Sequence, residues 1–598
     1  MGIGRVASGL HILFSVFVLW IIIAEWYLTG APAIADRSSP EHATASGPAV
    51  AESSGVAAKS SGVAAKRSGV AAKSTGVELS SKSTARQRRQ QGGEADAKVS
   101  AAGGIAQGNA GTVRRVPLGK VLFLIVHIGL FAMVLDFVYR PLIAPAEGLL
   151  VFRPGYVSHA AAKLHIRYPD GGQLELRYRE VLPKANLLYH NTDTEELEPA
   201  DSIPWESAGS FAPPTSETDF TMTTELLNLL PLTRYVVELH SRQPTLHAET
   251  VRLGSAEFKT APTPGDPTKL RFGTGSCIKP NFPYRPTMSP DVYGFASMLD
   301  HSEHLDMIMF MGDFIYADVP LYFGGDTEDY RRLYRQVYAA RSSRRLLRKV
   351  PMLHVYDDHE IKNNWHRQEQ APMGSAMTAY DEYNGRANPE PAVPGASYYN
   401  FTHGNVAFYA WDTRRYRTQW ETASSNGPEH TMLGREQKQH FVQWLHDVNH
   451  TAAVKFVVSS VPVTTGWSNH DSSQDTWRGY PTERAEILNL TQYVPNLLFL
   501  SGDRHEMAAV ELPSGNIEFS TSPVSQFTFP LVGMFKKDAD GDHTIHYRRQ
   551  GHVKYGIIDV DTETNPDIPR IIYSLYTTDV HDGQKSAWVY EAYGAPWH

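Results

Sequence analysis

Long apolar runs near the start of the chain are followed by alternating runs and then by short buried ones. His11–Leu28 and Val121–Val138 are each about 18 residues long, the minimum for a helix that crosses a bilayer. Residues 31–118 are rich in Ala, Gly, Ser and Lys, repeat the motif Ser-Gly-Val-Ala-Ala-Lys and contain few large apolar side chains. Such a segment buries too little surface to fold. The pattern therefore predicts a signal anchor or transmembrane helix over 1–30, a disordered loop, and a transmembrane helix over 119–140.

Basic residues around the second apolar run predict how the chain crosses the membrane. Three lie just before the run and two after it: Arg114, Arg115 and Lys120, then Arg140 and Arg153. By the positive-inside rule, this places the chain after Arg140 in an extracellular or lumenal space. Arg5 and the small-residue sequence Ala33-Ile34-Ala35, which suits signal-peptide cleavage, favour other topologies. We expect a membrane protein whose folded part is exoplasmic.

Between residues 148 and 264, apolar and polar positions alternate in short runs such as Lys163–Tyr168 and Tyr235–His240. This period of two predicts half-buried strands and an all-β sandwich. Leu229–Tyr235 has the form of a tyrosine corner, in which a Tyr hydroxyl ties a sandwich loop to the backbone. The segment 148–264 therefore resembles a fibronectin type III or immunoglobulin-like module.

Residues 268–598 combine short apolar runs with helical patterns, which predicts an α/β domain. We expect a helix over Asp329–Lys349, interpret its arginines as a solvated face and keep anion binding as the alternative. Four predicted strands end in polar residues: Gly275-Ser276-Cys277, Gly312-Asp313, Asp357-Asp358-His359 and Gly502-Asp503-Arg504-His505. Because α/β sheets place their ligands at the carboxyl ends of strands, we expect these donors to meet in one metal site.

Composition and charge narrow the classes of function. The net charge of −8, without a basic stripe of interleaved aromatics, gives no case for a nucleic-acid-binding domain. A single cysteine excludes an intramolecular disulfide bond. Cys277 is therefore either a small buried apolar residue or a ligand, and its place at a strand end favours the ligand.

The donor types indicate metal-assisted hydrolysis of a phosphoester. Asp313 has two oxygens and can bridge two cations, and Asn364 adds a neutral amide oxygen. Two metals about 4 Å apart can generate hydroxide near neutral pH and neutralise charge on a phosphoryl group during in-line attack. His359 could contact a phosphate oxygen or protonate the leaving group.

The order of the motifs resembles that of a known family. It runs Gly-Ser-Cys, Gly-Asp-x-x-Tyr, Asp-Asp-His-Glu-x-x-Asn-Asn-Trp, Asp-Thr-Arg-x-x-Arg and Ser-Gly-Asp-x-His between residues 270 and 510. This set resembles the PhoD-like alkaline phosphatases and phosphodiesterases of the calcineurin-like metallophosphoesterase superfamily, although Tyr356 stands where the family often has Trp. The resemblance implies a metallophosphatase two-sheet αββα sandwich over 268–598, preceded by a β-sandwich. It does not cover the first 140 residues.

The resemblance also implies a set of metal ligands. Fe(III) would be held by Cys277, Asp313, Tyr316 and Asp503. Ca(II) would share two of these and have three further ligands: Asp313 and Asp503, with Asp357, Asn364 and His505. Asp358 and His359 match the same motifs. Arg414 matches the later Asp-Thr-Arg motif, where it either orients a phosphate or forms a structural ion pair.

We therefore predict a membrane-anchored hydrolase that acts on a phosphate mono- or diester. Metal-bound hydroxide would attack phosphorus, with His359, Asp358 and Arg414 in catalytic roles. Two alternatives stay open: a phospholipase D-like phosphodiesterase and a non-catalytic receptor that binds phosphate. The first would prefer a choline phospholipid as substrate, and the second would bind phosphate without turnover.

Overall fold

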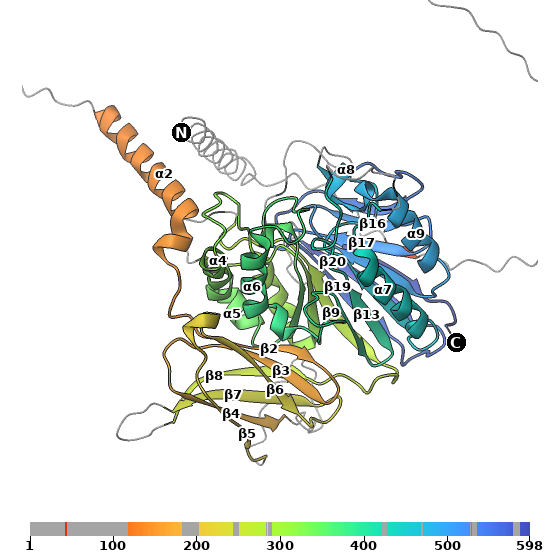
Figure 1. Ribbon diagram of the computed structural model, residues 1–598, viewed down its shortest axis with the longest axis horizontal. Helices are drawn as coiled ribbons and strands as arrows, with labels where there is room; N and C mark the ends of the chain where they lie inside the picture. Colours follow the sequence, from red (N-terminus) through yellow and green to blue (C-terminus); the bar gives the residue numbers. More distant parts are fainter. Residues whose placement is uncertain are drawn as a thin grey trace, which may run out of the picture. The chain divides into compact units, whose positions relative to one another are not determined.

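The computed structural model describes residues 42–44, 118–181, 203–242, 250–282, 284, 290–420, 427, 429–467, 471–526, 528, 535–577 and 586–597 (Figure 1). The first apolar run, His11–Leu28, and the Ser-Gly-Val-Ala-Ala-Lys repeats lie outside these residues. Their predicted states therefore stay predictions.

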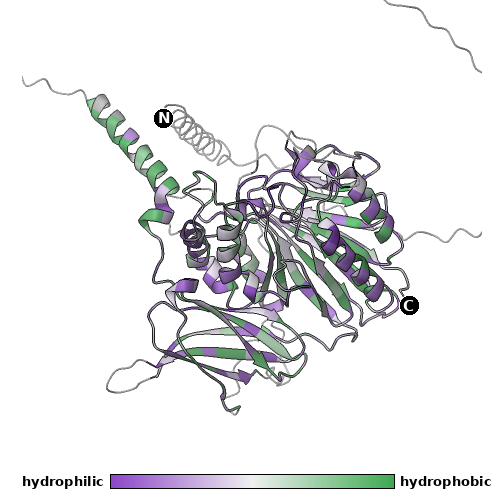
Figure 2. Ribbon diagram, in the orientation of Figure 1, coloured by the Kyte–Doolittle hydropathy of each residue, from purple (hydrophilic) through white to green (hydrophobic). Residues whose placement is uncertain are grey.

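Helix α2 (Leu118–Ile143) contains the second apolar run. Hydrophobic residues follow most of its length (Figure 2). Ile125 and Phe131 are 60% and 63% exposed. Leu124–Ile143 is long and apolar enough to cross a membrane, a criterion that a signal sequence also meets. The membrane span is thus compatible with the structure and stays a prediction.

The described residues between 151 and 259 form a β-sandwich of two antiparallel sheets. One has the order β2 (Val151–Val157), β3 (Ala161–Arg167), β6 (Thr221–Leu227), and the other β5 (Glu206–Phe211), β4 (Gln173–Glu180), β7 (Arg234–Arg242), β8 (Thr250–Lys259). Leu164, Leu176 and Val237 are fully buried between the sheets. The Tyr235 hydroxyl accepts a hydrogen bond from the Leu230 N–H (3.0 Å), the contact that a tyrosine corner requires.

Two seven-stranded sheets form the α/β part. The first has the order β1 (His42–Thr44), β21 (Trp588–Tyr593), β20 (Arg570–Thr577), β19 (Lys554–Asp561), β9 (Lys269–Gly275), β10 (Met307–Met311), β11 (Met352–Val355). The second has the order β12 (Tyr399–His403), β13 (Val406–Ala410), β14 (Val454–Val458), β15 (Leu497–Ser501), β17 (Ile517–Thr521), β16 (Met507–Glu511), β18 (His543–Arg548). Met309, Phe408 and Phe519 meet in one core, so the sheets pack face to face.

Helices cover the outer face of each sheet (Figure 1). The first sheet is covered by α3 (Tyr293–Met298), α4 (Thr327–Ala339), α5 (Arg341–Leu346) and α6 (Met373–Tyr383), and the second by α7 (Gly434–Val448) and α9 (Pro481–Thr491). This is the layered order that the resemblance implies. The single helix expected over Asp329–Lys349 is wrong, because the backbone of Ala340 is extended (ψ 139°) and separates α4 from α5.

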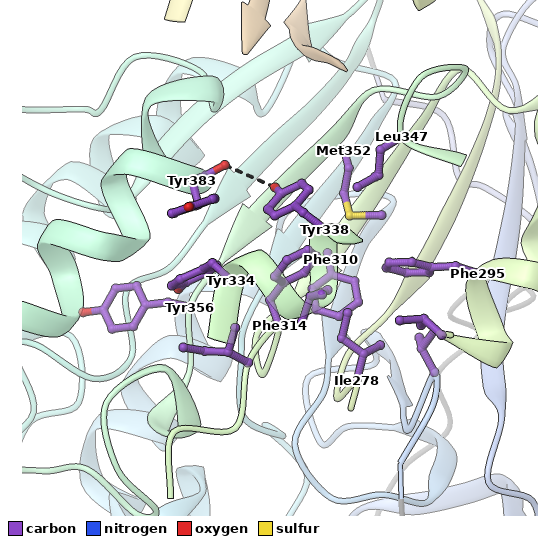
Figure 3. Packing of buried hydrophobic residues seen from close by; sticks show 14 of the residues in the cluster. Ile278, Phe295, Phe310, Phe314, Tyr334, Tyr338, Leu347, Met352, Tyr356 and Tyr383 are labelled. Carbon is purple, nitrogen blue, oxygen red and sulfur yellow. Dashed lines mark hydrogen bonds between the residues drawn. The ribbon is translucent and has the colours of Figure 1, made fainter. Parts of the chain in front are cut away.

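An aromatic cluster supports the turn after β10 (Figure 3). The ring centroid of Phe314, the residue after Asp313, lies 5.5 Å from that of Phe310 and 5.3 Å from that of Tyr338. The Tyr338 hydroxyl donates to the Tyr383 carbonyl (3.1 Å). Close packing allows such rings few alternative positions, so the turn has a rigid base.

Candidate metal centre

Strands β9 and β10 are parallel neighbours, and their carboxyl ends bring Cys277 and Asp313 together. The Cys277 N–H donates to the Gly312 carbonyl (3.1 Å), and the Ile278 N–H donates to the Asp313 carbonyl (2.9 Å). Cys277 Sγ lies 3.3 Å from Asp313 Oδ2. Burial and the charge of Asp313 raise the pKa of the Cys277 thiol well above its usual value. A bound cation would reverse this effect, because metal-ligating thiols are deprotonated.

Five predicted metal ligands have the left-handed backbone conformation that L-residues rarely adopt. They are Cys277 (φ 65°), Asp313 (59°), Asn364 (57°), Asp503 (72°) and His505 (57°). Gly312 has φ 91°, and a Cβ atom there would lie 2.5 Å from Cβ of Asp357. Glycine therefore lets the turns after β10 and β11 approach closely. Strained residues of this kind concentrate at functional sites.

Tyr316 links turns that belong to different sheets. Its hydroxyl donates to Asp313 Oδ2 (2.9 Å) and lies 2.7 Å from Nε2 of His505. In the same turn as His505, the Asp503 N–H donates to Oγ of Ser276 (3.2 Å). The end of β15 is thereby joined to the ends of β9 and β10.

Four carboxylates form the centre of the site. Asp313, Asp357, Asp358 and Asp503 each offer an oxygen within 4.8 Å of the others. Burial and neighbouring carboxylates raise the pKa of Asp313 and of Asp503 well above the usual value. Asp313 Oδ1 and Asp357 Oδ2 are buried and have no hydrogen-bond partner among the described residues. Mutual repulsion and unsatisfied oxygens are what a bound cation would relieve, so the donor set fits a metal.

Two further groups of potential ligands overlap with this centre. Cys277, Asp313 and His505 meet the same 4.8 Å limit, and so do Asp313, Asp358 and His359. Asp313 belongs to all three groups, as a bridging ligand must. Asn364 joins through its backbone N–H, which donates to Asp358 Oδ2.

Arg414 is fully buried beside these carboxylates. Its guanidinium forms ion pairs with Asp357, with Asp358 (3.4 Å) and with Asp475. Of the two roles considered for Arg414, these contacts match the structural ion pair and not the orientation of a phosphate. Arg417 also pairs with Asp475 (3.3 Å), and the two arginines lower the pKa of Asp475 although burial opposes them. The sequence pattern indicated no role for Asp475.

His359 has a carboxylate partner that the motifs did not indicate. Its Nδ1 lies 2.6 Å from Asp318 Oδ1, and its ring centroid lies 4.3 Å from that of Tyr316. Burial lowers the pKa of His359, but Asp318, Asp358 and Asp313 outweigh this effect and raise it well above its usual value. Asp318 follows Tyr316 by two residues, and that proximity was the signal available in the sequence.

Glu360 joins the turns that carry the ligands. Its carboxylate accepts hydrogen bonds from the backbone N–H groups of Asp313 (3.0 Å), Phe314 (2.5 Å) and Asp357 (2.7 Å). Asp357 and Glu360 form a capping box, which the spacing Asp-x-x-Glu could have indicated. The turns after β10 and β11 are held together by this one side chain.

Known proteins resemble the part of this chain that contains the site. Residues 274–566 match the family model of the PhoD-like phosphatases. These residues form a PhoD-like phosphatase domain. All ten predicted ligands and catalytic residues lie in this PhoD-like domain: Cys277, Asp313, Tyr316, Asp357, Asp358, His359, Asn364, Arg414, Asp503 and His505.

One curated relative and two solved structures extend the comparison. Alkaline phosphatase D of Bacillus subtilis is 26% identical over 321 residues, which are 46% of this chain and 52% of that protein. The chain thus spans about half the length of this relative. The structure of PhoD matches with a TM-score of 0.52 at 18% identity, over 75% of this chain and 92% of that one. Purple acid phosphatase PPD1 from yellow lupin seeds matches with 0.51 at 13% identity, over 74% of each chain.

The two solved structures show that the fold is shared. Together with the PhoD-like domain, they imply a metal cofactor. The four clustered carboxylates, with Cys277, Tyr316 and His505 beside them, supply donors that such a cofactor needs.

Proposed function

We propose that this chain is a metal-dependent phosphoester hydrolase of the alkaline phosphatase and phosphodiesterase type. The observation that carries the proposal is the cluster of Asp313, Asp357, Asp358 and Asp503 at the strand ends of a PhoD-like domain. Four crowded carboxylates, three of them buried, repel a phosphate group, so they would be unsuitable for a protein that binds phosphate directly. Metals held there would supply a nucleophilic oxygen and positive charge for in-line attack at phosphorus.

We assign the metals as the family resemblance implies, and the donor types are compatible with this assignment. Fe(III) would be held by Cys277, Asp313, Tyr316 and Asp503. The thiolate of Cys277 and the phenolate of Tyr316 are donors that suit this ion. Ca(II), for which oxygen donors are usual, would be held by Asp313 and Asp503 together with Asp357, Asn364 and His505. His505 lies within 4.8 Å of donors from Cys277 and Asp313, so it can serve either position. Other divalent metals would also fit the carboxylates.

His359 would act on the leaving group. Its Nδ1 is engaged by Asp318 (2.6 Å), which fixes the ring and leaves Nε2 as the nitrogen for proton transfer. From there the imidazolium can give a proton to the leaving oxygen. Asp318 is a positioning residue, since it acts through His359.

Arg414 would act by holding ligands. Its buried guanidinium pairs with Asp357 and Asp358, which keeps both carboxylates directed at the centre. We therefore prefer this positioning role to direct contact with the phosphate. Arg414→Lys should retain the charge and lose the fork, with lower metal affinity as the expected result.

We further propose how the rest of the chain presents this site. Segment 1–30 would be a signal anchor or transmembrane helix, and 31–118 a disordered loop. Segment 119–140 would be a transmembrane helix that leaves the folded part on the exoplasmic side. The sandwich would be a fibronectin III-like module over 148–264, followed by the phosphatase domain over 268–598. The exposed apolar side chains of α2 support the assignment of 119–140. The Tyr235 corner supports the assignment of the sandwich.

The test is turnover by the full chain, purified in detergent with calcium at alkaline pH. Nitrophenyl phosphate and bis-nitrophenyl phosphate would be compared, with a choline phospholipid as the third substrate. We expect turnover that Asp503→Asn abolishes and that the exposed control Asp266→Asn leaves unchanged. The ratio of the rates separates monoesterase, diesterase and phospholipase D-like activity. Tight phosphate binding by a folded, metal-loaded protein without turnover would refute the proposal in favour of a receptor.

A further inference from the structure

A charged cavity lies far from the metal centre. It has a volume of about 520 Å³ and is bounded by β8, the 3₁₀ helix Leu299–His304 and the region of α5. Leu299–His304 leads into the start of β10, and α5 leads toward the start of β11. The cavity is therefore at the amino ends of the strands whose carboxyl ends carry Asp313 and Asp357. With a rise of about 3.3 Å per residue, the five residues of β10 alone span about 17 Å.

Arginines dominate the wall that α5 contributes. Four line the cavity: Arg341, Arg344, Arg345 and Arg348. Their spacing of three and four residues places them on one face of α5 and the turn that follows it. Within the described part of the chain, none of the four guanidinium groups has an ion pair or a hydrogen bond. Arg341, Arg344 and Arg345 are exposed, and Arg348 is half-buried.

The cavity has an excess of positive charge. Its fifth cation, Lys349, is neutralised by an ion pair with Glu303. Glu257 and Asp300 also line the cavity but form no ion pair with the arginines. Four arginines against these two carboxylates leave two positive charges (4 − 2). Burial and the nearby Arg344 lower the pKa of Arg348, as expected for a cation without a counter-ion.

The arrangement of Arg348 joins the cavity to the β-sandwich. Its carbonyl accepts a hydrogen bond from the Glu257 N–H of β8 (2.8 Å). Its guanidinium lies against β8 at Gly254, where a Cβ atom would be 3.7 Å from Nη2. A ligand in the cavity would thus contact both the sandwich and the phosphatase domain.

We propose that this cavity binds a small molecule that carries one or two phosphate groups, at a site separate from the metal centre. Guanidinium groups bind phosphate oxygens in pairs, and clustered arginines are typical of phosphate recognition. The two excess charges match a phosphate dianion. The volume lies in the range of about 300 to 1,000 Å³ that small-molecule sites have. A concave site of this size favours a small ligand over a flat bilayer surface.

The test is calorimetric titration of the full, metal-loaded chain with propane-1,3-bisphosphonate. A phosphoester hydrolase does not cleave the carbon–phosphorus bonds of this probe. We expect Arg344→Gln/Arg348→Gln to weaken binding about tenfold or more, because two charge-assisted contacts are lost. Arg435→Gln, an exposed arginine on α7, is the matched control and should bind like the wild type. Asp313→Asn should also retain this binding, whether or not it abolishes hydrolysis.

Three results would overturn the proposal. Unchanged affinity in the arginine double variant is the first, and loss of binding in Asp313→Asn alone, which places the probe at the metal centre, is the second. The third is a wild-type protein that ignores the probe but binds phosphatidylserine vesicles through these arginines. Thermal melting would confirm that each variant is folded. Arg344→Lys, which keeps the charge and removes the fork, is the milder variant and should weaken binding less.

Discussion

Two buried clusters of charge in the folded part are built in opposite ways. Between the sandwich and the α/β layers, Asp219 accepts hydrogen bonds from Arg167 (2.9 Å) and Arg335 (2.6 Å). The Tyr383 hydroxyl donates to the same carboxylate. Burial acts to raise the pKa of Asp219, but these partners outweigh it and lower the pKa. One carboxylate between two guanidinium groups is a completed network.

The metal centre has the reverse ratio of charges. Within the described structure, only two arginines form ion pairs with its four carboxylates: Arg414 and Arg504. Arg414 also pairs with Asp475. Burial raises the pKa of Asp358 to about 6, and Arg414 and His359 only partly oppose this. The comparison teaches that a buried carboxylate with enough cationic partners supports the fold, whereas crowded carboxylates without them define a cation site.

Asp313→Asn should produce the largest effect. The substitution removes a shared carboxylate from the metal centre, so we expect phosphoester hydrolysis to fall by about a hundredfold or more. The metal-free variant should unfold at the same temperature as the metal-free wild type, or higher, because repulsion among the carboxylates is reduced. Initial rates and thermal melting measure the two effects. A fully active variant would contradict the assignment.

Asp219→Asn should show the opposite pattern. It leaves Arg167 and Arg335 buried without their counter-ion, and we expect unfolding free energy to fall by about 3 kcal/mol. The rate per folded molecule should stay within about twofold of the wild type. Denaturant unfolding followed by tryptophan fluorescence gives the stability. If stability is unchanged, the Asp219 network has no structural role.

The pH dependence of stability sharpens the same contrast. The folded-state pKa of Asp219 lies below its unfolded value, so its contribution is fully present above the unfolded pKa of about 3.9. That contribution is lost as the pH falls through the lower, folded value. The stability difference between wild type and Asp219→Asn should therefore narrow on acidification. A difference that widens as the pH falls would have the wrong sign for this account.

Tyr235→Phe should have the smallest effect. It removes the hydroxyl that accepts the Leu230 N–H, and the expected loss is about 1 kcal/mol of unfolding free energy without loss of activity. Tyr493→Phe is the matched control, because Tyr493 is 80% exposed. Equal stabilities for the two variants would show that the corner contact contributes nothing.

The predictable part of the site was the part read from strand ends. Short buried runs followed by Gly-Asp or Asp-Asp-His placed Asp313 and Asp357 at one edge of the first sheet, because parallel strands align their ends. Asp503 follows β15 of the second sheet, and it meets them because the two sheets pack face to face. The partners of these residues were harder to predict. Asp475 reaches Arg414 from a short helix 61 residues later in the chain, and no local period indicates such a contact.

The limits of periodicity also appear in the helices. The apolar spacing over 329–349 continues through Ala340, but the backbone there turns away and divides the pattern into two helices. The spacing of apolar residues indicates which face of a helix is buried. It does not indicate whether the helix axis changes direction between successive turns. The arginines after this break then line a cavity, which no pattern on a single helix could show.

The central claim is that the crowded carboxylates hold metals on which hydrolysis depends. The most direct measurement is to strip the full chain with a chelator, titrate iron and calcium back, and record bound metal and phosphoester turnover in the same sample. We predict that turnover is lost with the metals and returns in proportion to the metal bound, and that Asp313→Asn neither retains the metals nor recovers. Undiminished turnover by the metal-free protein, or equal metal binding by Asp313→Asn, would contradict the claim.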